Sequence, residues 1–249
     1  MTTFGFLLPT RKIVMTQEVP NFRQILDLAE HAESSGFDSV WVGDSVLARP
    51  RFEALTTLAA VAARTQRVRL GTAVLLPMLR HPVLLANEVA SLDHVAHGRL
   101  ILGVGIGGSN PAVAQEFAAC GVPIARRVGL FEETITLMRR LWTEPEVTFQ
   151  GRYFQVQSVR LGLRPLQQSG VPLWLAGSAD NALRRVLRLG GWLVAHFVLA
   201  AGLHGGLGAS PSLGARDGAR RPRPPSLFVY HAQRQRRCRP GGTRAARLH

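Results

Sequence analysis

The sequence predicts an α/β fold built from parallel strands. Short apolar runs alternate along the chain with segments in which apolar residues recur every three or four positions. These two patterns are typical of buried strands and amphipathic helices. The alternation repeats four times with short connections, which indicates parallel strands joined by right-handed crossovers. The length of 249 residues suits one large domain of this class.

The expected elements follow one another in order. The expected strands are 4–8, 38–43, 68–76, 100–105 and 171–177, and 191–195 could begin a sixth. Their helical partners are expected at 22–36, 55–62, 82–98, 130–141 and 180–189. The turn residues Gln150 and Gly151 predict a hairpin over 147–159, inserted between two strand-helix units.

A doubly wound sheet and a closed barrel share this alternation, so periodicity alone does not choose between them. The expected strands share one property, which is that each ends in small or polar residues. These are Pro9, Asp44 with Ser45, Thr72 with Ala73, Gly105 to Ser109, and Gly177 with Ser178. In a barrel all such ends converge on one rim, where active sites are built.

Four segments in this order resemble the luciferase-like monooxygenase family. They are GFDSVWVGDS (36–45), VRLGTAVLLPMLRHPVLLANEVASLDHVAHGRLILGVGIGG (68–108), FEETITLMRRLW (131–142) and VPLWLAGSADNALRRVLRLGGWL (171–193). The resemblance implies a TIM-type (β/α)8 barrel and an oxidoreductase or monooxygenase that uses reduced FMN or reduced coenzyme F420. It also implies a small organic substrate, with a flavin reductase and a second copy of the chain as candidate partners.

The resemblance also implies where the cofactor lies. Ala73 and Val74, after the small Thr72, would form a bulge behind the ring, where family members often hold a non-proline cis peptide. Gly105, Ile106 and Gly107 would let the backbone pass beside the ring. The cofactor phosphate would bind at the helix start formed by Gly177, Ser178 and Ala179. The alternatives are an ordinary strand end at 72–74 and a helix cap at Ser178.

The glycine-rich stretch 102–108 could also be taken for a dinucleotide fingerprint. That motif belongs in the first strand-helix unit, with an acidic residue about 20 positions on, whereas this stretch lies in the fourth unit. The barrel interpretation is therefore favoured.

Asp44 and His81 are the candidate catalytic residues. Some deazaflavin enzymes of the family have an Asp-His pair at the end of the second strand, whereas this chain has Asp44 followed by Ser45. The departure removes the obvious acid or base and puts alcohol oxidation in doubt. Asp44 could instead bind the ring or the substrate, or cap a helix, and His81 could be a capping histidine. No metal-ligand spacing or hydrolase motif occurs, so no metal is expected.

Two distant cysteines, Cys120 and Cys238, and the lack of an export signal favour a cytoplasmic protein. No membrane partner is expected, because glycines and histidines interrupt the uncharged stretch 189–215.

The last 59 residues differ from the rest of the chain. They contain 10 Arg but one acidic residue, Asp217, and 33 of the 59 positions are Arg, Gly, Ala or Pro. A reading-frame change near residue 195 would explain this composition. We therefore expect a partial barrel domain of about six strands over 1–195, and a disordered basic tail over 196–249 that is coil from about residue 210. The alternatives are an inactive remnant, or a genuine tail that binds nucleic acid, a partner otherwise not expected.

Overall fold

The structure is a computed structural model and describes residues 3–17, 19–176, 185, 189, 192–194, 198–199 and 227–230. Its main sheet contains the six expected strands in sequence order, each parallel to its neighbour. They are β1 (Thr3–Leu7), β2 (Ser39–Val42), β3 (Arg69–Thr72), β4 (Leu100–Val104), β7 (Leu173–Ala176) and β8 (Trp192–Val194). The predicted incomplete barrel of about six strands is confirmed.

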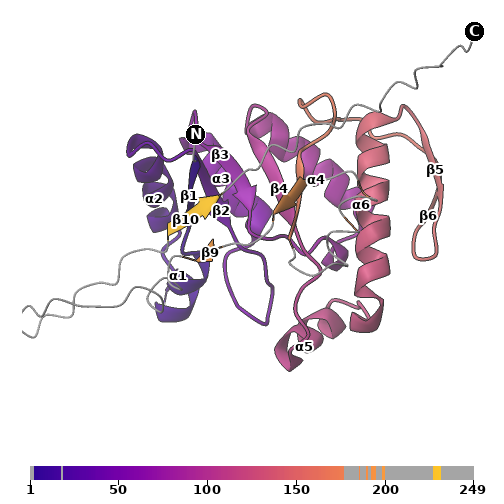
Figure 1. The fold of residues 1–249 in the computed structure, drawn as a ribbon, viewed down its shortest axis with the longest axis horizontal. Helices are drawn as coiled ribbons and strands as arrows, with labels where there is room; N and C mark the ends of the chain where they lie inside the picture. Colours follow the sequence, from indigo (N-terminus) through magenta and orange to yellow (C-terminus); the bar gives the residue numbers. More distant parts are fainter. Residues whose placement is uncertain are drawn as a thin grey trace, which may run out of the picture.

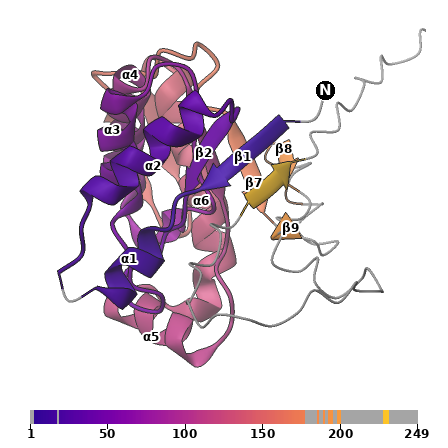
Figure 2. The same cartoon turned by 90° about the vertical axis from the view of Figure 1, so that its left-hand side faces the viewer.

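Four helices cover one face of this sheet, namely α2 (Arg23–Ser34), α3 (Ala54–Arg64), α4 (Pro82–Val95) and α6 (Arg127–Thr143). The other helical segments are α1 (Thr10–Thr16), α5 (Pro111–Ala119) and the short 3-10 turns η1 (Pro77–Leu79) and η2 (Ile124–Arg126). Figure 2 shows α2, α3 and α4 stacked along the strands. In both views α1 and α5 lie at one end of the molecule, toward which β1 points (Figures 1 and 2). That end carries the candidate site.

Local sequence explains where several helices begin. Proline at the first helical position and a capping side chain before it start α4, capped by His81, and α5, capped by Asn110. The side chain of Glu53 accepts a hydrogen bond from the Thr56 amide and caps α3 in the same way. These caps satisfy amides that the first helical turn leaves without partners.

The main core lies between the sheet and its helices, and it contains the fully buried Ile25, Leu58, Leu85 and Leu102. On the opposite, inner face of the sheet, Trp41 and Ile101 form a second cluster. Leu7, Ala73 and Trp174 pack against this pair. The strands are therefore apolar on both faces, as expected for a parallel sheet.

The predicted hairpin is confirmed. Strands β5 (Val147–Gln150) and β6 (Gln155–Val159) pair antiparallel and form a separate two-stranded sheet. The carboxylate of Glu133 on α6 accepts hydrogen bonds from the amides of residues 152–154. The turn is thus attached to the helix layer.

The expectation of coil from about residue 210 is wrong for residues 227–230, and the other residues from 210 onward lie outside the described residues. Instead of coil, β10 (Leu227–Tyr230) pairs antiparallel with β1, and β9 (Val198–Leu199) pairs with β10. The sequence LFVY has high β propensity, and the edge of β1 offers unpaired backbone groups. The predicted division at residue 195 stays a prediction. Within the described residues, no helix is long and apolar enough to cross a membrane.

Candidate active site

The backbone is irregular where β3 ends. The peptide bond between Ala73 and Val74 is cis, as the resemblance implied. Regular pairing of β3 with β4 stops before this bond and resumes at Leu75, which lies opposite Val104. The Gly103 carbonyl accepts hydrogen bonds from the Thr72 hydroxyl at 2.7 Å and from the Leu75 amide at 2.7 Å. The predicted bulge is therefore present, and both sides of it are hydrogen-bonded to one carbonyl group.

Glycines within β4 and directly after it allow neighbouring chain segments to approach closely. A Cβ atom on Gly103 would lie 2.1 Å from the Thr72 carbonyl oxygen, and one on Gly105 would lie 2.8 Å from a methyl group of Val74. Gly107 has a φ of 73°, which favours glycine, and the Phe117 ring lies beside it. These glycines thus allow close approach of neighbouring chain segments. Half-buried Ala73, Val74 and Ile106 remain as an apolar wall at the carboxyl ends of β3 and β4.

Three of the five predicted rim positions, those at Asp44, Ala73 and Gly105, are joined by hydrogen bonds. The Ala73 amide donates to the Val42 carbonyl at the end of β2, and the Gly105 amide donates to the Leu75 carbonyl. Asp44 joins them, because it accepts a hydrogen bond from the Leu76 amide at 2.9 Å. Residues 177–179, the predicted phosphate site, lie outside the described residues.

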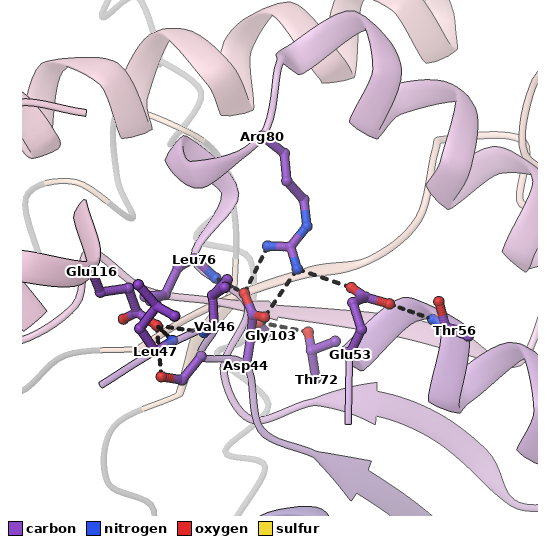
Figure 3. Close-up of polar contacts among 11 residues, drawn as sticks. Asp44, Val46, Leu47, Glu53, Thr56, Thr72, Leu76, Arg80, Gly103 and Glu116 are labelled. Atoms are coloured by element: carbon purple, nitrogen blue, oxygen red, sulfur yellow. Dashed lines mark hydrogen bonds and ion pairs between the residues drawn. The ribbon is translucent and has the colours of Figure 1, made fainter. Parts of the chain in front are cut away.

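Asp44 forms a two-point ion pair with Arg80, at 2.8 and 3.0 Å (Figure 3). Only 3% of the Asp44 side chain and 17% of the Arg80 side chain are exposed. Arg80 also donates to Glu53 at 2.9 Å. Burial works against the Arg80 cation, but the two carboxylates outweigh it and raise the Arg80 pKa. Asp44 therefore orients a cation at the rim.

A second carboxylate organises the loop after β2. One oxygen of the buried Glu116 on α5 accepts hydrogen bonds from the Ser45 hydroxyl at 2.7 Å, from the Leu47 amide at 2.8 Å and from the Val46 amide (Figure 3). Burial alone would raise the Glu116 pKa, but these hydrogen bonds outweigh it and lower the pKa. The loop consequently presents Val46 and Leu47, each about half exposed, at the rim.

His81 lies at the start of α4, where its ring nitrogen accepts a long, 3.4 Å hydrogen bond from the Val83 amide. The ring is exposed and meets Phe154 edge to face, with centroids 5.7 Å apart. This geometry favours the capping alternative for His81.

The opposite end of the strands holds a cavity of about 480 Å³. Its walls include Asp38, Ser39, Arg67, Arg69, Trp41 and Trp174. Asp38 already accepts a hydrogen bond from the Phe4 amide. Because active sites in barrels of this type lie at the carboxyl ends of the strands, this cavity is the weaker candidate. Groups of three or more potential metal ligands do not occur among the described residues.

Sequence reasoning missed Arg80 and Glu116. Arg80 lies 36 residues from Asp44, and Glu116 lies 71 residues from Ser45. A weak signal existed for Glu116, since it is the one acidic residue in the otherwise apolar and neutral segment PAVAQEFAA. A buried carboxylate requires hydrogen-bond donors, but the sequence does not say which ones.

Known proteins share this arrangement. The luciferase-like monooxygenase family matches residues 2–206. An F420-dependent glucose-6-phosphate dehydrogenase of Intrasporangium calvum is 36% identical over 175 residues, which are 68% of this chain and 52% of the relative. The chain thus spans about half the length of this curated relative.

Two solved structures share the fold. Monooxygenase RslO1 from Streptomyces bottropensis superposes with a TM-score of 0.69 and 30% identity, over 77% of this chain and 58% of that one. An F420-dependent secondary alcohol dehydrogenase, solved with an F420-acetone adduct, superposes with a TM-score of 0.66 and 25% sequence identity. The match covers 82% of this chain and 61% of the dehydrogenase chain. With the parallel strands, the bulge and the family match together, the chain belongs to the luciferase-like monooxygenase family.

Proposed function

We propose that this chain binds the deazaflavin coenzyme F420 at the carboxyl ends of β2, β3 and β4, and takes part in hydride transfer between the coenzyme and a small organic molecule. The observation that carries the proposal is the convergence of Asp44, Ala73 and Gly105, where hydrogen bonds join the carboxyl ends of β2, β3 and β4. The F420-dependent relative supports the deazaflavin over FMN.

The described residues fit a flat aromatic ring. Half-buried Ala73, Val74 and Ile106 offer apolar contact, and none of them places a charge against the ring plane. When bound, the coenzyme supplies a carbon that accepts or donates a hydride. The chain's contribution is to position the ring, to exclude water from the wall and to hold the Arg80 cation beside it through Asp44.

The side chains of Asp44 and Ser45, at the end of β2, bear on which reaction this site can support. The Ser45 hydroxyl donates to Glu116, and both oxygens of Asp44 accept hydrogen bonds from Arg80. Among the described residues at the end of β2, the carboxylate of Asp44 is thus already paired with a cation, and the Ser45 hydroxyl is a weak base. This observation favours a second candidate function, in which reduced FMN is bound and molecular oxygen is the oxidant that oxygenates a small substrate. The likeness to monooxygenase RslO1 also supports an oxygenation.

Titration of the purified chain with F420 and with FMN, followed by cofactor fluorescence, tests the proposal. Saturable binding of F420 that is tighter than binding of FMN supports it. Val74→Asp should weaken binding at least about tenfold, because a carboxylate would be desolvated against the ring. Val95→Asp is the control, since Val95 is exposed at the end of α4, near the amino ends of the strands. Preference for FMN would support the second candidate, and binding of neither cofactor would refute both.

A further inference from the structure

Arg51, in the loop between β2 and α3, has a guanidinium group that is incompletely paired. Its Nε donates to the Arg49 carbonyl at 3.2 Å. Neither terminal nitrogen has an acceptor among the described residues, and neither is sealed from solvent, although the residue is half-buried. Up to four N–H donors therefore remain available at this position.

The guanidinium of Arg51 lies against the backbone of Gly43, immediately after β2. A Cβ atom built on Gly43 would be 1.7 Å from Nη1 of Arg51 and 3.6 Å from the Ala73 carbonyl oxygen. The absence of a side chain at residue 43 is what allows the guanidinium to occupy this space. Arg51 thus lies beside the bulge that we assign to the cofactor ring.

Two more arginines strengthen the positive charge here. Arg11 lies on α1, which follows β1, and Arg49 lies in the same loop as Arg51; none of the three forms an ion pair within the described residues. Burial is the largest cause of the lowered Arg51 pKa, and the positive charges of Arg11 and Arg49 lower this pKa further. The neighbouring carboxylates of Asp44 and Glu116 oppose this only in part.

The carboxylates of Asp44 and Glu116 already have other hydrogen-bond partners. Arg80 takes both oxygens of Asp44, and the 45–47 turn binds Glu116. The same turn fixes the position of Arg51, because the Arg49 amide donates to the Ser45 hydroxyl and the Arg49 carbonyl accepts from Arg51. The cationic group is therefore built into a defined loop, and no carboxylate among the described residues pairs with it.

We propose that Arg51, with Arg11 and Arg49, binds the anionic group of the substrate, so that this enzyme acts on a small molecule carrying a phosphate or a carboxylate. This inference rests on the proposed function for the position of the cofactor. Guanidinium groups suit both anions, because their N–H donors match two oxygens at once. The anion would be held beside the wall formed by Ala73, Val74 and Ile106.

Inorganic phosphate is the first probe, titrated calorimetrically into the full chain without cofactor. Arg51→Gln should weaken phosphate binding about tenfold or more, because charged hydrogen bonds are lost. Arg23→Gln is the matched control, since Arg23 is exposed on α2 and makes no ion pair among the described residues. Equal phosphate affinity in Arg51→Gln and Arg23→Gln would overturn the proposal. This arm does not depend on cofactor binding, so it separates failure of the anion site from failure of the proposed function.

A second variant moves the cation without removing it. Gly43→Ala should displace the Arg51 guanidinium and weaken phosphate binding severalfold, while net charge stays constant. Wild-type affinity in Gly43→Ala would contradict the assigned position of Arg51. A final arm compares F420 with its deazaflavin fragment that lacks the phosphate and glutamate tail. If Arg51→Gln weakened binding of F420 but not of the fragment, the site would hold the cofactor tail, and the substrate assignment would be wrong.

Discussion

Arg80 and Asp44 form a two-point ion pair, with distances of 2.8 and 3.0 Å, across 36 residues of sequence. Because little of either side chain is exposed, removing the charge of one partner leaves the other desolvated without its counter-ion. The pair connects the end of β2 with the turn before α4 and so determines the shape of the rim.

Asp44→Asn should therefore destabilise the fold by about 2–3 kcal/mol, less than a fully buried pair because Glu53 still binds Arg80. Urea denaturation followed by circular dichroism measures the change. Asp27→Asn, on the surface of α2, serves as the control and should change stability by less than about 0.5 kcal/mol. If Asp44→Asn lost no more stability than Asp27→Asn, the ion pair between Asp44 and Arg80 would contribute nothing to the stability of the fold.

Glu116→Gln should loosen the loop after β2. The neutral amide keeps one acceptor oxygen but loses the charge that strengthens the hydrogen bonds from Ser45, Val46 and Leu47. We expect faster hydrogen exchange at the amides of 46 and 47 and a loss of about 2 kcal/mol. Glu88→Gln, on the exposed face of α4, is the control and should change neither the exchange rate of these amides nor the stability. Unaltered exchange in Glu116→Gln would mean that other contacts hold the loop.

Stability should fall in acid. The pKa values of Glu53 and Glu116 are lowered in the fold, because hydrogen bonds from backbone amides and side chains outweigh burial, which alone would raise them. Their stabilising contribution is complete above the unfolded value of 4.5 and is lost as pH falls through the lower folded values. Urea unfolding from pH 7 to pH 3 should show this decline, and Glu116→Gln should reduce its slope. A flat profile below pH 4.5 would contradict the assignment.

Gly103→Ala should be one of the most damaging small substitutions. Its Cβ would lie 2.1 Å from the Thr72 carbonyl oxygen, which is backbone and cannot rotate away. We expect a loss of about 3 kcal/mol, measured by thermal or urea unfolding. Gly162→Ala is the matched control, because a Cβ there meets nothing within 4 Å and its φ is not positive. Similar stabilities for the two variants would show that β3 and β4 can separate freely at this position.

Much of the fold was predictable from local pattern. The apolar runs and helical spacings gave the order of the six parallel strands, and the turn residues Gln150 and Gly151 gave the hairpin. The resemblance to a known family located the cis bond between Ala73 and Val74, which no residue periodicity indicates. Local pattern works here because each strand-helix unit buries its own apolar face against its neighbours.

The site was less predictable, because its contacts join distant parts of the chain. Asp44 was identified from its place at the end of β2, but its partner Arg80 depends on the turn at η1, whose geometry is not encoded by spacing. Glu116 stands out only as the one acidic residue of its helix, and its hydrogen-bond partners become known only when α5 is packed beside the loop after β2. The pairing of β10 with β1 was missed, because composition hid a short β-prone run within an Arg-rich segment.

Hydrogen exchange with and without F420 tests the central claim most directly, since it shows which end of the strands binds the coenzyme. The account predicts added protection at the amides of residues 75–76 and 105–107, beside the bulge, and none at residues 36–41 and 67–69, which line the cavity at the opposite end. Protection confined to 36–41 and 67–69 would place the coenzyme at the wrong end of the strands. That result, or no protection at saturating F420, would contradict the assigned site.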